Sequence, residues 1–307
     1  MPIFATNWQA TGANRMWHGD TVVIDHTLPE HPLFSMAALA RLIETLPREN
    51  YMLMHTGRVG SDKKLWIEGE IGDLSGEEVI EAIRRGNLWL LVRRVEDVSE
   101  AMSHLLEQVY DEIDSNVEGG YPTFNRISDI LISSPSAQVY YHFDHNGQTL
   151  WQIHGSKRVY VYPNRPPFLT KEMLEYTALY ADETSVPYEP WYDKEAKVYE
   201  LKAGQMVHWP LFSPHRVENL EFSVSYTTQY YTPRIRRLAK VHAGNGLIHT
   251  RLPQLKLSDS IQGPSYAAKS LLQSGVYRLG LLDKLRQGKR ATNFKLHPKD
   301  LGQIIPV

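Results

Sequence analysis

The chain has 307 residues, of which 42% are hydrophobic, 22% charged and 10% aromatic, and it contains no cysteine. This composition supports a sizeable apolar core and excludes a wholly disordered chain. The absence of cysteine excludes disulfides, thiol nucleophiles and Cys-ligated metal sites, which leaves His, Asp and Glu as ligands for any metal. No run approaches the roughly 18 apolar residues of a membrane-spanning helix, and the N-terminus has no secretory pattern, so we expect a cytoplasmic protein without a membrane segment.

The formal charge of −2 hides an asymmetry along the chain. Residues 234–307 carry 14 Lys or Arg against 3 acidic residues, whereas residues 1–233 carry 19 against 32. A basic tail on an acidic body predicts either binding to acidic partners or to further copies of the chain, or simply solvated outer helix faces. Only three aromatic residues lie in the tail, too few for a nucleic-acid stacking platform, so we do not expect nucleic acid as a partner.

Residues 1–125 are predicted to form a mixed α/β N-terminal elaboration. A Ser followed three residues later by Glu is typical of a capping box, and this motif opens one of the expected helices. The expected elements are a strand at Thr21–Asp25, a helix at Ser35–Leu46, a helix from Ser75 to Gly86, a strand at Leu88–Val92 and a helix at Val98–Ile113.

Residues 126–233 change to short apolar runs separated by turn residues, a pattern typical of an all-β sandwich or barrel. The runs are 127–132, 138–143, 149–153, 158–162, 197–201, 205–209 and 222–231. The turn His154-Gly-Ser156 predicts a hairpin between two of them. Residues 163–195, with five prolines, are expected to form an insertion over a pocket mouth. Residues 234–307 are expected to be a basic helical segment, with helices at Ser265–Gln273 and Val276–Arg286 divided at Gly275.

Two His-x-Asp triplets occur, His18-Gly-Asp20 and His142-Phe-Asp144, and only the second lies in the β-rich region. In a strand, residues i and i+2 point to the same face, so His142 and Asp144 can enter a barrel interior together. A second His from a facing strand would complete the two-His, one-carboxylate triad of non-haem Fe(II) oxygenases, which leaves metal positions open for a chelating co-substrate and dioxygen. His215, after a Pro-rich bend, is the preferred third ligand, and His208 is the alternative.

A dicarboxylate co-substrate also needs a cation deep in the barrel. Lys157 follows the predicted turn thirteen residues after Asp144, and a buried ammonium is tolerable beside a carboxylate. Gln148 and Gln229 fall on strands expected to flank the same cavity. We therefore expect both amides to hydrogen-bond to co-substrate or substrate.

The segments QVYYHFDHNGQTLWQIHGSKRVYVYP (138–163) and GQMVHWPLFSPHRVEN (204–219) resemble the JmjC or cupin-like Fe(II)- and 2-oxoglutarate-dependent oxygenases. The strongest likeness is to the asparaginyl hydroxylase that inhibits hypoxia-inducible factor and to bacterial cupin-like relatives. The resemblance implies a double-stranded β-helix, iron bound by the His142, Asp144 and His215 side chains, and Lys157 paired with the remote 2-oxoglutarate carboxylate.

One position departs from the family pattern. The family often has Thr three residues before the first His, where this chain has Val139, so Tyr140, Thr149 or Tyr160 is expected to supply the second hydroxyl contact.

The combined prediction is an Fe(II)/2-oxoglutarate-dependent dioxygenase that hydroxylates a C–H bond on a protein or peptide side chain. A small-molecule hydroxylase, an N-methyl demethylase and a non-catalytic cupin-like binding module are the alternatives. Family members often dimerise through C-terminal helices, so a homodimer is expected. An acidic groove would suit a basic peptide, and its expected members are Glu172, Glu175, Asp182, Glu183 and Glu189.

Overall fold

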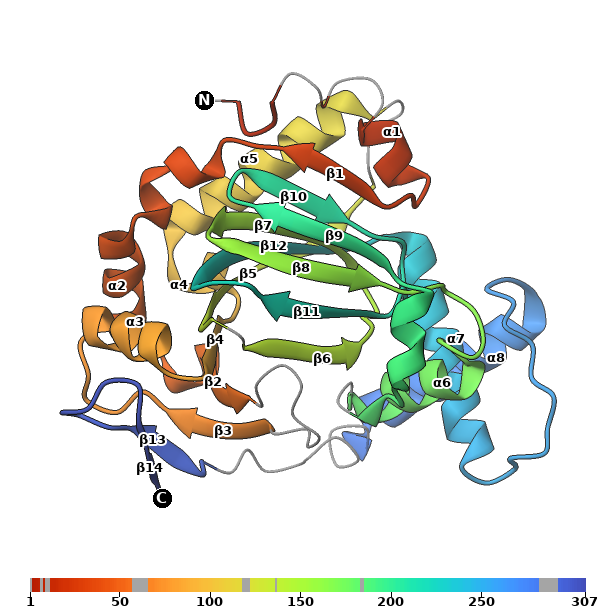
Figure 1. Cartoon of the computed structure of the whole chain (residues 1–307). Helices are drawn as coiled ribbons and strands as arrows, with labels where there is room; N and C mark the ends of the chain where they lie inside the picture. The colour runs from red at the N-terminus through yellow and green to blue at the C-terminus, as the bar shows by residue number, and fades with distance from the viewer. Residues whose placement is uncertain are drawn as a thin grey trace.

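The structure, a computed structural model, describes residues 2–5, 8, 12–56, 66–117, 122–135, 137–182, 185–281 and 292–307. Two antiparallel-rich sheets face each other (Figure 1). The ten-stranded sheet has the order β1 (Val22–Asp25), β10 (Gln205–His208), β7 (Gly147–His154), β12 (Ser223–Tyr231), β5 (Phe124–Ser133), β4 (Leu88–Val92), β2 (Tyr51–Thr56), β3 (Trp66–Glu70), β13 (Phe294–Leu296) and β14 (Ile304–Pro306). The four-stranded sheet has the order β6 (Gln138–His142), β11 (His215–Asn219), β8 (Ser156–Val161) and β9 (Lys197–Lys202).

Strands β5 to β12 form a double-stranded β-helix, or jelly roll, as predicted. Four of them, β5, β12, β7 and β10, lie side by side in the large sheet, and the other four make up the small sheet. Six of the seven connections along the chain from β5 to β12 carry it from one sheet to the other, and only the connection from β8 to β9 stays within the small sheet. This winding creates one interior between the two sheets, into which alternate residues of every strand point.

The alternation separates two cores on the faces of the large sheet. Leu150 and Val207 join Val159 and Val217 of the small sheet in the apolar interior of the jelly roll. Their neighbours in sequence, such as Trp151 and Met206, pack instead in the larger core beneath the helices. The helices of the N-terminal part that contribute to this core are α1 (Gly12–Trp17), α2 (Met36–Glu44), α3 (Gly76–Arg85) and α5 (Glu100–Asn116), with α4 (Val95–Val98) leading into α5.

The local signals in the N-terminal part are confirmed. Ser35 caps α2, and Ser75 and Glu78 form the predicted capping box of α3, which ends at Gly86. Sequence analysis missed β2 and β3, which extend the large sheet beyond the jelly roll. The C-terminal strands β13 and β14 then pair along β3.

The predicted hairpin at His154-Gly-Ser156 is wrong, although the turn itself is present. β7 belongs to the large sheet and β8 to the small sheet, so the chain crosses between sheets at this point. Gly155 makes the crossing with φ +71°, in the left-handed region that favours glycine. A Cβ at this residue would collide with the backbone oxygen of Phe222.

Substitution of Gly155 by Ala should therefore destabilise the protein by about 2 kcal/mol or more, because left-handed strain and a backbone clash add together. Chemical denaturation of both proteins measures the difference in the free energy of unfolding. Gly72→Ala is the matched control, since Gly72 also has positive φ (+67°) but open space around its Cβ direction. Equal losses in the two variants would show that the clash contributes nothing.

The helical predictions for the later part of the chain need correction. The insertion 163–195 contains α6 (Lys171–Tyr180), whose N-cap Thr170 accepts from the Met173 amide. A long helix, α7 (Pro233–His249), follows β12 directly, within the segment expected to be helical but at a position where no individual helix was predicted.

The C-terminal segment 234–307 is not wholly helical, since it ends in β13 and β14. The expected break at Gly275 is absent, because α8 (Gly263–Arg278) runs through that residue. Residues 282–286 of the last predicted helix lie outside the described residues.

The helices α6, α7 and α8 gather at one end of the sheets, on the side opposite to β13 and β14 (Figure 1). Within the described part of the chain, no helix has the length and apolar character needed to span a membrane. The division into parts at residues 125 and 233 stays a prediction.

Candidate metal centre and co-substrate pocket

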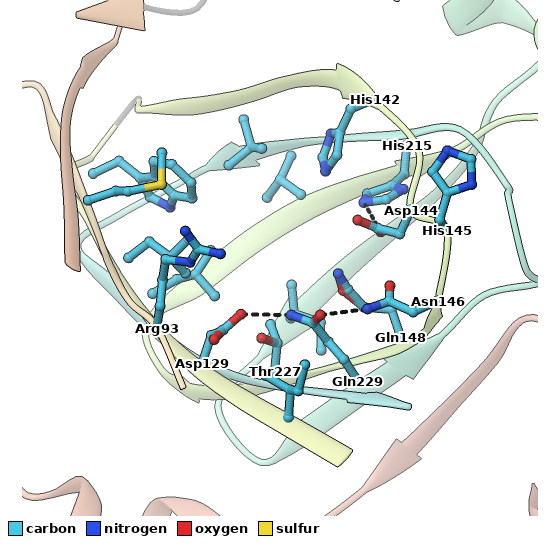
Figure 2. A pocket seen from close by; sticks show the side chains of 18 of the residues that line it. Arg93, Asp129, His142, Asp144, His145, Asn146, Gln148, His215, Thr227 and Gln229 are labelled. Atoms are coloured by element: carbon cyan, nitrogen blue, oxygen red, sulfur yellow. Dashed lines mark hydrogen bonds and ion pairs between the residues drawn. The ribbon is translucent and has the colours of Figure 1, made fainter. Parts of the chain in front are cut away.

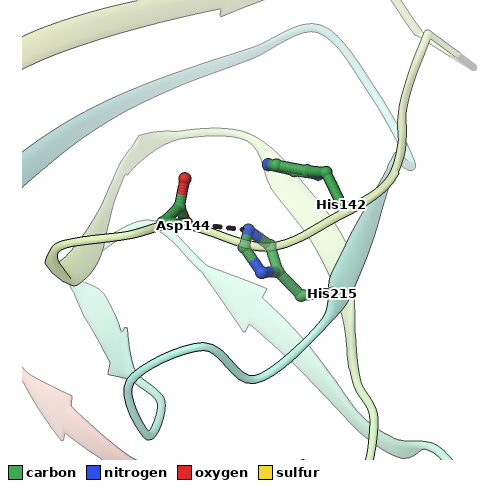
Figure 3. Close-up of side chains that lie close together, drawn as sticks. All are labelled: His142, Asp144 and His215. Carbon is green, nitrogen blue, oxygen red and sulfur yellow. Dashed lines mark ion pairs between the residues drawn. The ribbon is translucent and has the colours of Figure 1, made fainter. Parts of the chain in front are cut away.

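Three side chains converge at the open end of the jelly roll. His142 ends β6 and His215 begins β11, and the two residues are direct partners in the antiparallel register. Asp144 lies two residues after His142, just beyond the end of the strand. One ligand atom from each of the three lies within 4.8 Å of the others, and His215 Nε2 is 3.5 Å from Asp144 Oδ2 (Figure 3).

Both imidazoles are oriented by backbone carbonyls. His142 Nδ1 lies 2.7 Å from the Tyr140 oxygen, and His215 Nδ1 lies 3.1 Å from the Ser213 oxygen. Donation from Nδ1 leaves the Nε2 lone pair of each ring available to a metal, which is the usual arrangement of outer partners around metal-binding histidines.

The charge state of the cluster fits a divalent cation. Burial, and next the proximity of His142, lower the pKa of His215 well below its usual range, so its imidazole is neutral. Burial raises the pKa of Asp144, while the His142 ring and Gln148 act in the opposite direction. Asp144 Oδ2 is buried without a hydrogen-bond partner among the described residues. Two imidazole nitrogens and a carboxylate oxygen are the donor set that suits Fe(II).

The alternative ligand His208 is outside this cluster. It is buried on β10, its Nδ1 lies 2.9 Å from the Gln148 backbone oxygen, and burial lowers its pKa to about 4. His145 follows Asp144 but binds in another direction, with Nε2 2.7 Å from the Thr177 hydroxyl of α6. The structure therefore favours His215 as the third ligand.

A pocket of about 570 Å³ opens beside the cluster (Figure 2). Its floor consists of alternate residues from neighbouring strands of the large sheet, and its roof includes β6 and β11. The floor residues are Gln148 and Leu150 of β7, Thr227, Gln229 and Tyr231 of β12, Ile127, Asp129 and Leu131 of β5, Trp89 and Leu91 of β4, Arg93 just after β4, and Met52 of β2.

Both predicted amides line this pocket. Gln229 accepts from Asn146 Nδ2 at 2.6 Å and donates to Asp129 Oδ2 at 2.7 Å, which forms a polar row along the floor (Figure 2). Gln148 Oε1 is buried without a hydrogen-bond partner in the described part of the chain, and so can bind a ligand donor. Sequence analysis missed Asp129, although an acidic residue inside the apolar run Ile127–Ile132 is itself an indication of a polar site.

Lys157 points into the jelly roll, since it alternates with Ser156 and Arg158 and shares a face with the interior residues Val159 and Val161. It is 2% exposed, and burial lowers the pKa of its ammonium group to about 7. Along β8, Lys157 lies four residues from Val161, the partner of His215 in register. That separation is about 13 Å between Cα atoms, which a lysine side chain and a five-carbon dicarboxylate together can bridge.

Three residues were expected to replace the hydroxyl missing at Val139, and the structure places them differently. Thr149 is not among the pocket-lining residues. It pairs in register with Thr228, and the Thr228 hydroxyl accepts from Trp151 on the helix-covered face of the large sheet. Thr149 therefore lies on that face and not on the pocket face. Tyr160 lies on the outer face of β8, where Arg216 stacks on its ring. Only Tyr140 lines the pocket.

No protein-family model matches this chain, and no curated protein matches its sequence. Solved structures do match. The X-ray structure of Escherichia coli YcfD is 17% identical with a TM-score of 0.50, over 94% of this chain and 71% of that chain. Another structure, described as the E. coli ribosomal oxygenase YcfD in complex with cobalt and 2-oxoglutarate, is 18% identical with a TM-score of 0.46, over 91% and 71% of the two chains. At this identity the likeness concerns the fold, and it agrees with the jelly roll described above.

Proposed function

We propose that this chain is an Fe(II)- and 2-oxoglutarate-dependent oxygenase that hydroxylates a C–H bond on a protein or peptide side chain. The proposal is supported above all by one observation: a two-His, one-carboxylate cluster lines a pocket, and a buried lysine, itself outside the pocket lining, lies on the neighbouring strand four residues from the register partner of His215. We also propose that the chain is a member of the JmjC or cupin-like family, with a particular likeness to the asparaginyl hydroxylase.

When bound, Fe(II) with 2-oxoglutarate supplies oxidative decarboxylation coupled to oxygen insertion into a C–H bond. The chain supplies ligands and orientation. His142, Asp144 and His215 would hold the metal, and the backbone carbonyls next to the Nδ1 atoms of both rings fix their tautomers. The Lys157 ammonium pairs with the remote carboxylate of 2-oxoglutarate, which compensates a charge that is otherwise buried alone.

The remaining pocket residues position the substrate. Gln148 and Gln229 offer amide groups beside the metal ligands, and Gln229 is held from both sides by Asn146 and Asp129. Apolar side chains of β4, β5 and β2 line the rest of the floor and exclude water from the reacting carbon. Thr149 has no part in this proposal, and Tyr140 is the candidate for the hydroxyl contact.

The experiment is anaerobic addition of Fe(II) and 2-oxoglutarate to the metal-free protein. We expect a weak visible charge-transfer band of the chelate and, on admission of oxygen, conversion of 2-oxoglutarate to succinate. A protein that gives neither would be a binding module. A search of cell extract for a +16 mass change on a protein, set against loss of a methyl group or change in a small molecule, then separates hydroxylation from the alternatives.

A basic peptide as substrate has less support from the acidic residues that suggested it. Glu175 is buried and its carboxylate lies 2.5 Å from His249 Nδ1 on α7. Asp182 accepts hydrogen bonds from Tyr176 and Ser185. Glu183 lies outside the described residues, and none of the other four is among the residues that line the pocket.

A homodimer through the C-terminal helices is part of the proposal. Leu271 and Leu279, on and just after α8, are 74% and 72% exposed, and Tyr277 is 59% exposed. Burying such side chains against a second copy gains about 1.5–3 kcal/mol each.

We expect Leu271→Glu to shift the protein from dimer to monomer, because a charge would enter the apolar interface. Light scattering after size-exclusion chromatography measures the mass. Val198→Glu, at an exposed apolar residue of β9, is the control and should leave the mass unchanged. A wild-type protein that is monomeric at high concentration would contradict the dimer.

A further inference from the structure

The pocket extends beyond the jelly roll onto strands of the N-terminal part. Trp89, Leu91 and Arg93 alternate along β4 and its end, and all three line the pocket floor. Met52 of β2 adjoins them, since it pairs with Leu91 in register. This end of the pocket is therefore formed by β4 and β2, and the polar row from Asn146 to Asp129 leads to it along the floor (Figure 2).

Arg93 brings a positive charge to this surface. Its side chain extends into the pocket beside Asp129 (Figure 2). Its backbone is fixed from both sides, because its N–H donates to the Asn50 oxygen at 2.7 Å and its carbonyl accepts from Asn50 Nδ2 at 3.2 Å. Among the residues that the structure describes, the guanidinium makes no ion pair and no hydrogen bond.

The charged residues beside Arg93 in the pocket lining, Asp129 and Arg94, each have hydrogen-bond or ion-pair partners, although the Arg93 charge also acts on the Asp129 carboxyl group. Asp129 Oδ1 accepts from the Arg94 backbone N–H at 2.8 Å, and its Oδ2 accepts from Gln229. The adjacent guanidinium of Arg94 forms an ion pair with Asp97. Arg94, which also lines the pocket, is thus already paired with an acidic side chain, whereas the side-chain donors of Arg93 have no partner in the described part of the chain.

A second donor lies on the same face of β4. Trp89 is 6% exposed, and its indole Nε1 is buried with no hydrogen-bond partner in the described part of the chain. A buried donor without an acceptor destabilises the protein, and a ligand oxygen that accepts from it would remove this penalty. Trp66 packs against Trp89 with ring centroids 5.2 Å apart, so the surroundings of this donor are apolar.

We propose that this end of the pocket binds a carboxylate of the substrate, with Arg93 as a bidentate donor and Trp89 Nε1 as an additional one. The carboxylate site itself is argued from this end of the pocket alone, and the inference rests on the proposed function only in assuming that the bound molecule is hydroxylated at the metal. The substrate is then a molecule that carries a carboxylate at a distance from the carbon to be hydroxylated. An acidic side chain, a free C-terminus and a small acid share this chemistry.

The test compares isosteric probes by calorimetry. The protein is saturated with Zn(II) and 2-oxoglutarate, which occupies the Lys157 site without turnover, and is titrated with 3-phenylpropionate or 3-phenylpropionamide. We expect the carboxylate to bind at least about tenfold more tightly than the amide, because hydrogen bonds to charged groups contribute about 1.5–3 kcal/mol. Arg93→Met should abolish this preference, and Trp89→Phe should reduce it.

Arg94→Gln is the matched control, since it removes a neighbouring charge that is already paired with Asp97. An equal loss of preference in Arg94→Gln and Arg93→Met would mean that only the long-range field matters, and would overturn the proposal. Equal affinity of the wild type for acid and amide would overturn it as well. If the metal or 2-oxoglutarate does not bind, the metal-free protein is titrated with the same two probes. The preference for the acid over the amide, and its dependence on Arg93, can then still be measured.

The source of the carboxylate is resolved by two further probes. N-acetylglutamate α-amide carries it on the side chain, and N-acetylglutamine carries it at the C-terminus. Arg93-dependent binding of N-acetylglutamate α-amide supports an acidic side chain as the source of the carboxylate. Arg93-dependent binding of N-acetylglutamine supports a free C-terminus. Binding of 3-phenylpropionate alone supports a small acid.

Discussion

Asp144→Ala should weaken Fe(II) binding by more than about 100-fold and abolish 2-oxoglutarate turnover. Loss of even an outer partner of a metal ligand costs about 10–100-fold in affinity, and Asp144 is proposed as a direct ligand. Its carboxyl group is also the single acidic group in a cluster whose other members are imidazoles. Removing it leaves a dipositive ion without compensation in a buried site. Equilibrium dialysis against Fe(II) under anaerobic conditions measures the affinity.

The informative control is the neighbouring histidine. His145→Gln should keep Fe(II) binding within a few-fold of wild type, because that ring binds the Thr177 hydroxyl and is not part of the metal cluster. If His145→Gln lost the metal as completely as Asp144→Ala, the ligand set proposed from the geometry would be wrong. Unchanged Fe(II) affinity in Asp144→Ala would likewise show that the proposed ligand set is wrong.

The metal cluster could be predicted from sequence because its determinants are local. His142 and Asp144 are two residues apart, and the Pro-rich bend before His215 is a short motif. The pairing of His142 with His215 adds the long-range step, and this step follows from the strand order of a jelly roll. Sequence analysis therefore predicted the three side chains that the structure brings together.

The distal end of the pocket could not be predicted in the same way. Trp89, Arg93 and Asp129 meet only because β4 pairs with β5, and no local pattern reports that register. Sheet membership is equally non-local: the turn at Gly155 reads as a hairpin, yet it carries the chain from one sheet to the other. Thr149 shows the same limit, since a residue on the correct strand can point to the wrong face.

Lys157→Met should raise the dissociation constant for 2-oxoglutarate by about 100-fold or more in the Zn(II)-loaded protein. Breaking a buried ion pair by removal of one partner costs about 3–5 kcal/mol, because the other charge stays buried alone. Calorimetry measures the constant. Lys202→Met, at an exposed lysine of β9, is the control and should bind 2-oxoglutarate as the wild type does. An unchanged constant in Lys157→Met would remove this lysine from the co-substrate site.

The same lysine predicts a pH dependence with a definite sign. In the free protein its pKa is lowered to about 7 by burial, whereas a bound carboxylate favours the charged form. Above pH 7, binding of 2-oxoglutarate must therefore take up a proton, and its affinity should fall by up to tenfold for each pH unit.

Calorimetry at pH 8 in two buffers of different ionisation enthalpy should show an uptake of nearly one proton by the wild type and none by Lys157→Met. The free protein supplies a second check. Between pH 7 and about 10 the unfolded chain holds this proton and the folded chain does not, so the free energy of unfolding should rise with pH relative to Lys157→Met. An ammonium group that met solvent or an internal carboxylate would give neither effect, because only burial without a counter-charge makes the folded protein release the proton that the co-substrate restores.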